Sequence, residues 1–411
     1  MRPAQARINL RRAAAGVAAA TLIVAATGTA AQADDNPVQK IAARILAGAE
    51  PGAALRVVVT SRTADGRPSV VATTAPNRTR ALQLITNELS KSSTVGVDIA
   101  HTVRIAASTS NDTYRSKQWA LTRFKAESVW KKSTGSGVIV AVVDTGVTAS
   151  QADLSGHVLS GKDFVAPGTA ATDENGHGTH VAGIIAAVAD NKRGIAGLAR
   201  NARILPVRVL DASGSGTSDN VANGIIWAAD HGAKVISLSL GSTQSDPAEQ
   251  AAVAYAVSKN IVVVAAAGND GCSAGLLGLG ATQPSYPAAY ANVLGVGAIN
   301  SNGSVASYSD CGSWVDVVAP GTSIISTMIN KPDSGLGCQS GVAYCYLSGT
   351  SMATPYAAAA AALEISKLGS SSKQSTVRSL LQSTADNVGP AGRDDASGYG
   401  VINPGRLLGA S

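Results

Sequence analysis

Continuous apolar runs alternate with helical patterns through the part of the chain that begins near residue 111. The run at 138–143 is mostly β-branched and contains no polar position, as expected of a strand buried on both faces of a parallel sheet. Strands are predicted at 138–143, 203–209, 234–240, 261–266 and 292–298, and helices at 178–189, 218–231 and 247–259. This alternation predicts an α/β domain with a mostly parallel sheet flanked by helices. Its functional residues are expected at the C-terminal ends of the strands.

A shorter and different pattern precedes this domain. Residues 54–60 and 96–107 are predicted to be strands, and residues 78–91 show helical spacing. Residues 34–110 are therefore predicted to form a small separate α+β domain, and residues 111–411 the larger domain. The polar segment 108–112 is predicted to be an exposed joint, which is either a plain linker or a processing site.

The first 33 residues have the pattern of an export signal. A segment with four arginines precedes an apolar run at 13–26, and Ala31-Gln32-Ala33 supplies a small-x-small cleavage pattern. A retained signal anchor is the alternative, but the run is shorter than the roughly 20 residues of a membrane span. Residues 1–33 are thus predicted to be a signal peptide and the mature protein to be secreted and free of the membrane. Arg11-Arg12 leaves general or twin-arginine export open.

Composition and charge narrow the class of protein further. Of the 411 residues, 45% are hydrophobic and 15% are charged, which indicates a globular chain and excludes a disordered one. The formal charge is +6, but no stripe of lysine and arginine with interleaved aromatic residues occurs. Nucleic acid is therefore not an expected partner. The mature protein is expected to be a monomer.

Polar residues follow three of the predicted strands. Asp144 ends the first run, Ser239-Leu240-Gly241 ends the third, and Asn269 follows the fourth. Taken alone, each is more often a turn or cap residue.

Two further residues lie at the starts of helical patterns. His177 stands between glycines, and Ser351 follows Gly349-Thr350 and precedes an Ala-rich run. A helix N-terminus favours developing negative charge, which suits a nucleophile whose substrate becomes an oxyanion. His177 and His180 are also candidates for a metal pair, but they lack the Glu and the spacing of HExxH.

The chain order Asp144, His177, Ser351 is that of one class of serine protease. The segments 142–146, 177–183 and 349–355 closely resemble the three signatures of the subtilisin-like serine proteases. This resemblance implies a subtilisin-like fold and a secreted serine endopeptidase. Ser351 would be the nucleophile, His177 the base, Asp144 the group that orients the base, and Asn269 the oxyanion donor.

Two other activities remain open for the same residues. A binding module on this scaffold would not react at Ser351, whereas an esterase or peptide ligase would use the same triad. The first is disfavoured because all three triad positions and Asn269 are present. Sequence alone does not distinguish the second.

The resemblance also implies a peptide-binding site. Gly214, Ser215 and Gly216 and, separately, Ser239, Leu240 and Gly241 resemble the strands that bind substrate in this family. An extended protein or peptide substrate would pair with them as an added strand. Simple turns are the alternative. Residues 34–110 resemble the family's inhibitory propeptides, which implies a precursor matured by their removal.

A structural calcium site is a further implication, although the chemistry requires no cofactor. Asp112, Asp153 and Asn191 resemble positions that bind Ca²⁺ in relatives, together with backbone carbonyls of the loop 188–195. Lys192 and Arg193 lie within this loop, and their charge would oppose a cation unless the side chains point outward.

Four cysteines, all in the last third of the chain, predict two disulfides in an exported protein. Three pairings are possible. The short spacing of Cys338 and Cys345 favours a local bond, which leaves Cys272 with Cys311. A zinc site is the alternative, but no CxxC pair is present.

Two features depart from the family pattern. Tyr356 follows Pro355 where a histidine is common, and we expect it to add bulk near the helix start. The segment 271–285 is long and rich in Gly and Leu, and we expect it to shape the pocket next to the scissile bond.

Overall fold

The computed structural model divides the chain into two compact units, residues 1–105 and 106–411. It describes residues 36–99, except 48, 50, 51, 66 and 67, and residues 110–409, except 273–282, 331–335, 340 and 370. The predicted signal peptide and most of the segment 271–285 lie outside the described residues. No helix among the described residues combines the length and apolar character needed to span a bilayer.

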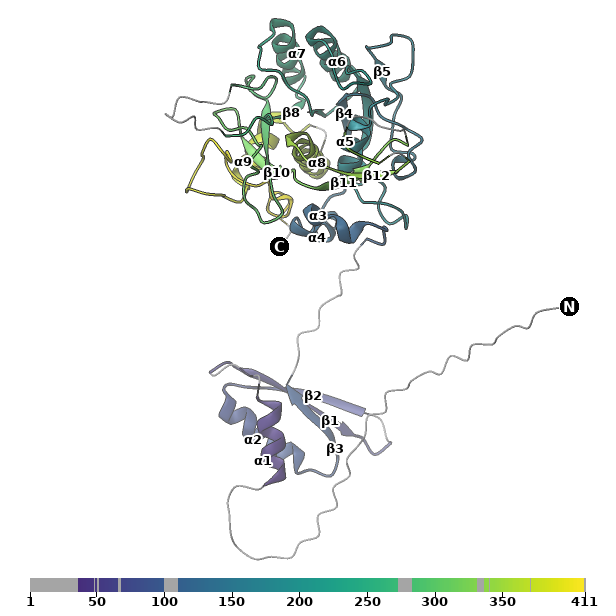
Figure 1. Cartoon of the computed structure of the whole chain (residues 1–411). Coiled ribbons are helices and arrows are strands. Elements are labelled where there is room, and N and C mark those ends of the chain that lie inside the picture. The colour runs from purple at the N-terminus through teal and green to yellow at the C-terminus, as the bar shows by residue number, and fades with distance from the viewer. Residues whose placement is uncertain are drawn as a thin grey trace, which may run out of the picture. The chain divides into compact units, whose positions relative to one another are not determined.

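The N-terminal unit is a three-stranded antiparallel sheet with two helices (Figure 1). The sheet order is β2-β1-β3, and the core is formed by seven buried apolar side chains from both helices and all three strands. Asn36 and Asn77 cap the two helices through their side chains. The elements are α1 (Pro37–Ile45), β1 (Leu55–Arg62), β2 (Pro68–Ala75), α2 (Arg78–Leu89) and β3 (Thr94–Ile99).

The centre of the larger unit is a seven-stranded sheet in which all pairs are parallel. The strand order is β10-β9-β8-β7-β4-β6-β5. A separate antiparallel hairpin pairs β11 with β12. The strands are β4 (Ile139–Asp144), β5 (Lys162–Asp163), β6 (Arg203–Arg208), β7 (Val235–Leu238), β8 (Val262–Ala266), β9 (Leu294–Ile299), β10 (Val317–Pro320), β11 (Ile324–Thr327) and β12 (Tyr344–Leu347).

Helices cover both faces of this sheet (Figure 1). Val140 and Val142 of β4 pack in a cluster with α5 and α8, whereas Ala141 and Val143 pack with α6 and α7. Successive strand side chains therefore enter two separate cores, which explains the continuous apolar runs. The helices are η1 (Arg115–Lys117), α3 (Trp119–Arg123), α4 (Ala126–Trp130), η2 (Ala152–Leu154), α5 (His177–Ala186), α6 (Ser218–Asp230), α7 (Pro247–Ser258), α8 (Thr350–Leu368), α9 (Gln374–Ser383) and α10 (Pro404–Leu407).

The observed elements confirm the predicted fold class. All five predicted strands and three predicted helices of the larger unit are present, with ends that differ by up to three residues. The strand predicted at 96–107 ends at Ile99 where it is described, and its remainder lies outside the described residues. Tyr356 is 2% exposed and packs edge-on against Phe124, so its bulk fills the core under α3.

Candidate active site

Asp144 and His177 are joined by a hydrogen bond. Asp144 is the last residue of β4 and is fully buried, and His177 is the first residue of α5. His177 Nδ1 lies 2.8 Å from Asp144 Oδ1, which also accepts the N–H of Thr145 at 2.7 Å. With a proton on Nδ1 for this bond, the neutral ring keeps Nε2 free to accept a proton.

The surroundings of His177 shift its basicity. Burial of the ring opposes protonation, but the charge and hydrogen bond of Asp144 outweigh it, and the charge of Asp173 adds to them. The pKa of His177 is therefore raised above its usual value. The side chain remains 17% exposed, so the ring is accessible from solvent. A base with this environment can take and return a proton near neutral pH.

Asp173, which was not among the predicted site residues, holds the N-terminus of α5. Its Oδ1 accepts the N–H groups of Asn175 and Gly176 at 2.9 and 2.7 Å and the hydroxyl of Thr145 at 2.9 Å. Its Oδ2 accepts the N–H and hydroxyl of Thr179 at 2.9 and 2.6 Å. Asp173 thus ties the end of β4 to the start of α5. An Asp shortly before a predicted helix start is the sequence signal for such a cap.

Ser351 lies in the first turn of α8, beside the end of β7. Its hydroxyl donates to the carbonyl of Ser239 at 3.1 Å, and the hydroxyl of Ser239 donates to the carbonyl of Ser351 at 2.9 Å. The first N–H groups of a helix have no partner within it, so the Ser351 N–H is available as a donor. α8 packs against α5, which carries His177.

Asn269, after β8, presents an amide donor beside Ser351. Its Oδ1 accepts the N–H of Thr350 at 2.8 Å and the hydroxyl of Thr350 at 3.0 Å. These two donors identify this atom as the oxygen, so Nδ2 is the opposite atom of the amide. Nδ2 donates to none of the described residues, and Asn269 lines a cavity of about 250 Å³ with Ser351.

The two segments predicted to bind substrate lie on one larger cavity. Gly214, Ser215, Gly216, Ser239, Leu240 and Gly241 all line a cavity of about 740 Å³, and His177 lines it too. Leu240, Gly241 and Ser242 are shared with the smaller cavity beside Ser351. The structure therefore brings the predicted strands, the base and the nucleophile to one connected surface.

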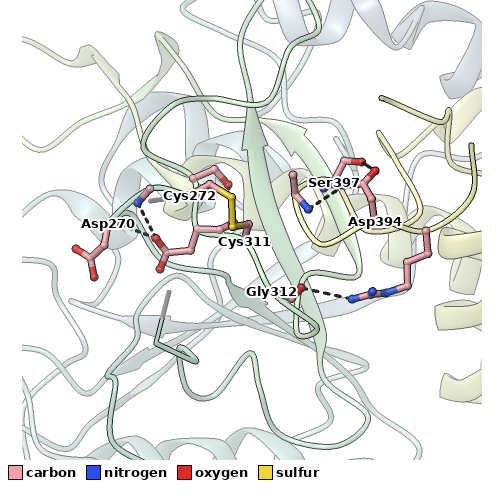
Figure 2. Close-up of a disulfide and its surroundings, with 11 residues drawn as sticks. Asp270, Cys272, Cys311, Gly312, Asp394 and Ser397 are labelled. Atoms are coloured by element: carbon pink, nitrogen blue, oxygen red, sulfur yellow. Dashed lines mark hydrogen bonds between the residues drawn. A yellow bond between two sulfur atoms is a disulfide. The ribbon is translucent and has the colours of Figure 1, made fainter. Parts of the chain in front are cut away.

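The cysteines pair as the sequence predicts, Cys272 with Cys311 and Cys338 with Cys345. Figure 2 shows the first bond beside Asp270, whose N–H donates to Asp310 Oδ1 at 2.6 Å. On its other side, Gly312 donates its N–H to the carbonyl of Asp395 at 2.8 Å. The segment that follows Asn269 is thus fixed to two other loops.

His180 has a structural position and does not face the cavities. It is fully buried, and its Nε2 lies 3.1 Å from the carbonyl oxygens of Ile324 and Cys345. Burial lowers the pKa of His180 to about 3, so the ring stays neutral and joins α5 to the hairpin of β11 and β12.

The three residues predicted to bind calcium are brought together. Asp112 accepts the N–H groups of Asp190 and Asn191 at 3.0 Å each, and Asp153 accepts Asn191 Nδ2 at 2.7 Å. Both carboxyl groups are buried, and burial raises the pKa of Asp153, with the charge of Asp112 adding to this effect.

These residues have the donor chemistry of a calcium site. Lys192 and Arg193 are exposed, so their side chains point away from the two carboxyl groups. A buried carboxylate pair beside an amide and loop carbonyls suits Ca²⁺, which prefers oxygen ligands. No group of three or more His, Cys, Asp or Glu side chains at metal-binding distance occurs in the described part of the chain.

Comparison with known proteins places this geometry in a family. Residues 135–400 match the sequence profile of the subtilase family. The chain is 47% identical over 291 residues to thermitase from Thermoactinomyces vulgaris, which covers 71% of this chain and 96% of thermitase. It is 36% identical over 398 residues to an extracellular protease from Xanthomonas campestris pv. campestris, which covers 86% of this chain and 66% of that protein.

A solved structure of proteases from Pseudoalteromonas arctica is also similar. Its TM-score is 0.64 and its sequence identity 32%, and the match covers 74% of this chain and 99% of that one. The all-parallel sheet with helices on both faces is the subtilisin-like α/β fold. With a matching profile, close relatives and a matching fold, the chain belongs to the subtilase family of serine endopeptidases.

Proposed function

We propose that Ser351, His177 and Asp144 form the catalytic triad of a secreted endopeptidase that cleaves peptide bonds through an acyl-enzyme. The observation that carries this proposal is the 2.8 Å contact between His177 Nδ1 and the buried carboxylate of Asp144. It fixes the ring so that Nε2 is the atom that exchanges protons. The adjacent cavities bring Ser351 and Asn269 to the same surface.

In the first step, the Ser351 hydroxyl turns from the carbonyl of Ser239 toward His177 and attacks the substrate carbonyl carbon. His177 Nε2 takes the hydroxyl proton, and Asp144 stabilises the resulting imidazolium. The carbonyl oxygen becomes an oxyanion, which accepts hydrogen bonds from Asn269 Nδ2 and the Ser351 N–H. The C–N bond then breaks, and the proton on His177 passes to the leaving amine.

The second step reverses the roles with water. His177 removes a proton from water as the water oxygen attacks the ester carbon of the acyl-enzyme. The same two donors stabilise the second oxyanion, and the proton on His177 returns to Ser351 Oγ as the C–O bond breaks. The carboxylic acid product leaves, and the enzyme is regenerated without a cofactor.

We also infer that the substrate lies extended along residues 214–216 and 239–241. Main-chain pairing with these two glycine-containing segments would give broad specificity.

We further infer that residues 34–110 are an inhibitory propeptide, which is removed after the loss of residues 1–33. Asp112, Asp153 and Asn191 would hold a structural Ca²⁺, which when bound neutralises the two buried carboxylates. The extracellular protease named above is consistent with export.

The triad proposal is tested by labelling with a fluorophosphonate followed by peptide mass spectrometry. Label is expected on Ser351, and Ser351→Ala should abolish both labelling and proteolysis. Ser366→Ala is the matched control, because Ser366 lies on the same helix and donates to the carbonyl of Ser136, away from the cavities. Labelling of another serine, or proteolysis by Ser351→Ala, would contradict the assignment.

Maturation is tested with the same variant. If processing is autocatalytic, Ser351→Ala produced in a protease-free host should keep residues 34–110 attached. N-terminal sequencing gives the answer, and normal processing of this variant would reject autocatalysis while leaving the triad assignment intact.

A further inference from the structure

The larger cavity contains a buried carboxyl group that the proposed mechanism does not use. Glu249 lies in the first turn of α7, is 5% exposed, and lines the cavity of about 740 Å³ that also contains His177. Asp246 is the other acidic residue of the lining, and no lysine or arginine occurs among the described lining residues. The cavity is therefore acidic at the end formed by α7.

Asp246 is already occupied by structural hydrogen bonds. Its Oδ1 accepts the N–H groups of Ala248 and Glu249 at 2.8 and 3.1 Å, as an N-cap does. Its Oδ2 accepts the hydroxyl of Ser218 at 2.7 Å, which joins the starts of α6 and α7. Asp246 thus fixes the turn from which Glu249 projects.

The carboxyl group of Glu249 has only part of its hydrogen-bonding capacity satisfied. Its Oε2 lies 3.3 Å from the hydroxyl of Tyr290, which also donates to the carbonyl of Asp246 at 3.0 Å. One hydroxyl proton serves two acceptors, so neither bond is fully made. The other oxygen, Oε1, has no hydrogen-bond partner among the described residues and is not sealed from solvent. A buried carboxylate in this state gains strongly from an incoming donor.

The groups around Glu249 favour its neutral form in the free enzyme. Burial raises the pKa of Glu249 to about 7; the Tyr290 hydroxyl opposes this shift and the charge of Asp246 adds to it. From the neighbouring α6, Ser218 and Val221 line the same cavity, and neither carries a charge. The carboxyl group is therefore ionised only above about neutral pH, when no cation is bound.

We propose that Glu249 makes the α7 end of this cavity a subsite for an arginine or lysine side chain of the peptide substrate. This rests on the proposed function, because it requires substrate to lie along 214–216 and 239–241. The guanidinium or ammonium group would donate to Glu249 Oε1, and the aliphatic stem would contact apolar lining residues such as Val221 and Leu240.

The side chain that reaches Glu249 does not belong to the residue at the scissile bond. The smaller cavity, beside Ser351 and Asn269, receives that residue, and Leu240 and Gly241 form the wall between the two cavities. A strand advances about 3.3 Å per residue with side chains alternating between faces, so the basic residue lies two or more positions away.

The test uses blocked, internally quenched peptides that carry arginine, citrulline or leucine at each of four positions before the scissile bond. Citrulline keeps the shape of arginine without its charge. At one position beyond the first, kcat/KM for arginine should exceed that for citrulline by about tenfold at pH 8.5, the lower end for a hydrogen bond to a charged group. The arginine-to-citrulline ratio should fall toward one at pH 5.5. Protonation of His177 lowers the rates for both peptides by the same factor, so it does not affect this ratio.

Glu249→Gln should bring the arginine-to-citrulline ratio to about one at every pH. Glu249→Leu provides the same measurement if the Gln variant does not fold. Asp219→Asn is the matched control, since it removes an exposed negative charge from the first turn of α6 and should keep the ratio. An unchanged ratio in the Glu249 variants, or no arginine preference in the parent enzyme, would overturn the subsite. Failure of the parent enzyme to cleave any peptide would instead reject the proposed function.

Discussion

Removing the Cys272–Cys311 disulfide should destabilise the larger unit more than removing Cys338–Cys345. A disulfide restricts the unfolded chain, and its entropic effect grows with the logarithm of the loop that it closes. The two bonds close sequence separations of 39 and 7 residues. The chain-entropy relation then gives about 3.9 and about 2.4 kcal/mol at 25 °C, a difference of about 1.5 kcal/mol.

The two disulfides have similar structural surroundings, so their removal can be compared directly. None of the four cysteines is fully buried, although Cys338 and Cys345 pack against the edge of the core, so replacing each by serine removes little buried volume. Both bonds lie in the same unit and link loop or hairpin segments. The difference between the two double variants should therefore reflect loop length.

The assay is equilibrium unfolding in urea, followed by tryptophan fluorescence, after recovery of the signal on dilution has been verified. Cys272→Ser/Cys311→Ser and Cys338→Ser/Cys345→Ser are each made in the Ser351→Ala background, which prevents self-digestion. Equal losses in the free energy of unfolding, or a larger loss for the short loop, would refute the entropic reasoning. Equal m-values across the variants are required for the comparison.

Three further predictions concern the site. Asn269→Ala should lower kcat by about 10²–10³ with little change in KM, the magnitude known for the corresponding donor of subtilisin itself; an effect confined to KM would contradict the oxyanion role. Because the pKa of His177 is raised and its neutral form is the base, kcat/KM should fall as pH drops through a midpoint above 6.5, and a pH–rate profile with a lower midpoint would reject the influence of Asp144. Ca²⁺ at about 100 times its Kd should stabilise the Ser351→Ala protein by about 2.7 kcal/mol in thermal melts, and Asp153→Asn should remove this effect. Asp190→Asn, on the same loop but ion-paired with Arg200, should retain it, and equal behaviour of the two variants would exclude the site.

The central strands could be predicted because of how they are buried. The five runs from 138–143 onward are apolar at successive positions, since their side chains enter cores on both faces of the sheet. β5 has two residues and β10 to β12 have four each, which is too short for a pattern to be recognised. Their positions depend on pairing with strands far away in the sequence.

The site residues also divide into those that the sequence could predict and those that it could not. Asp144, His177, Asn269 and Ser351 could be named from short motifs, because each motif supplies its own local backbone geometry. Asp173 could be named only as a helix cap, because four of its five hydrogen bonds come from residues 175, 176 and 179, which are near it in sequence. Its fifth bond, from Thr145, depends on folding. Glu249 looks in sequence like an ordinary acidic residue of a first helical turn, and only the packing of α7 against the cavity distinguishes it.

The sheet separates the two halves of the proposed site into different cores. His177 and Ser351 are carried by α5 and α8, which pack on one face, whereas α6 and α7 form the cavity wall and pack on the other. Substitutions that repack α6 against α7 can therefore change which peptides are accepted without displacing the reacting side chains. In directed evolution, the range of substrates can therefore be changed separately from turnover. The alanine-rich α8, which carries Ser351, is the element to leave unaltered.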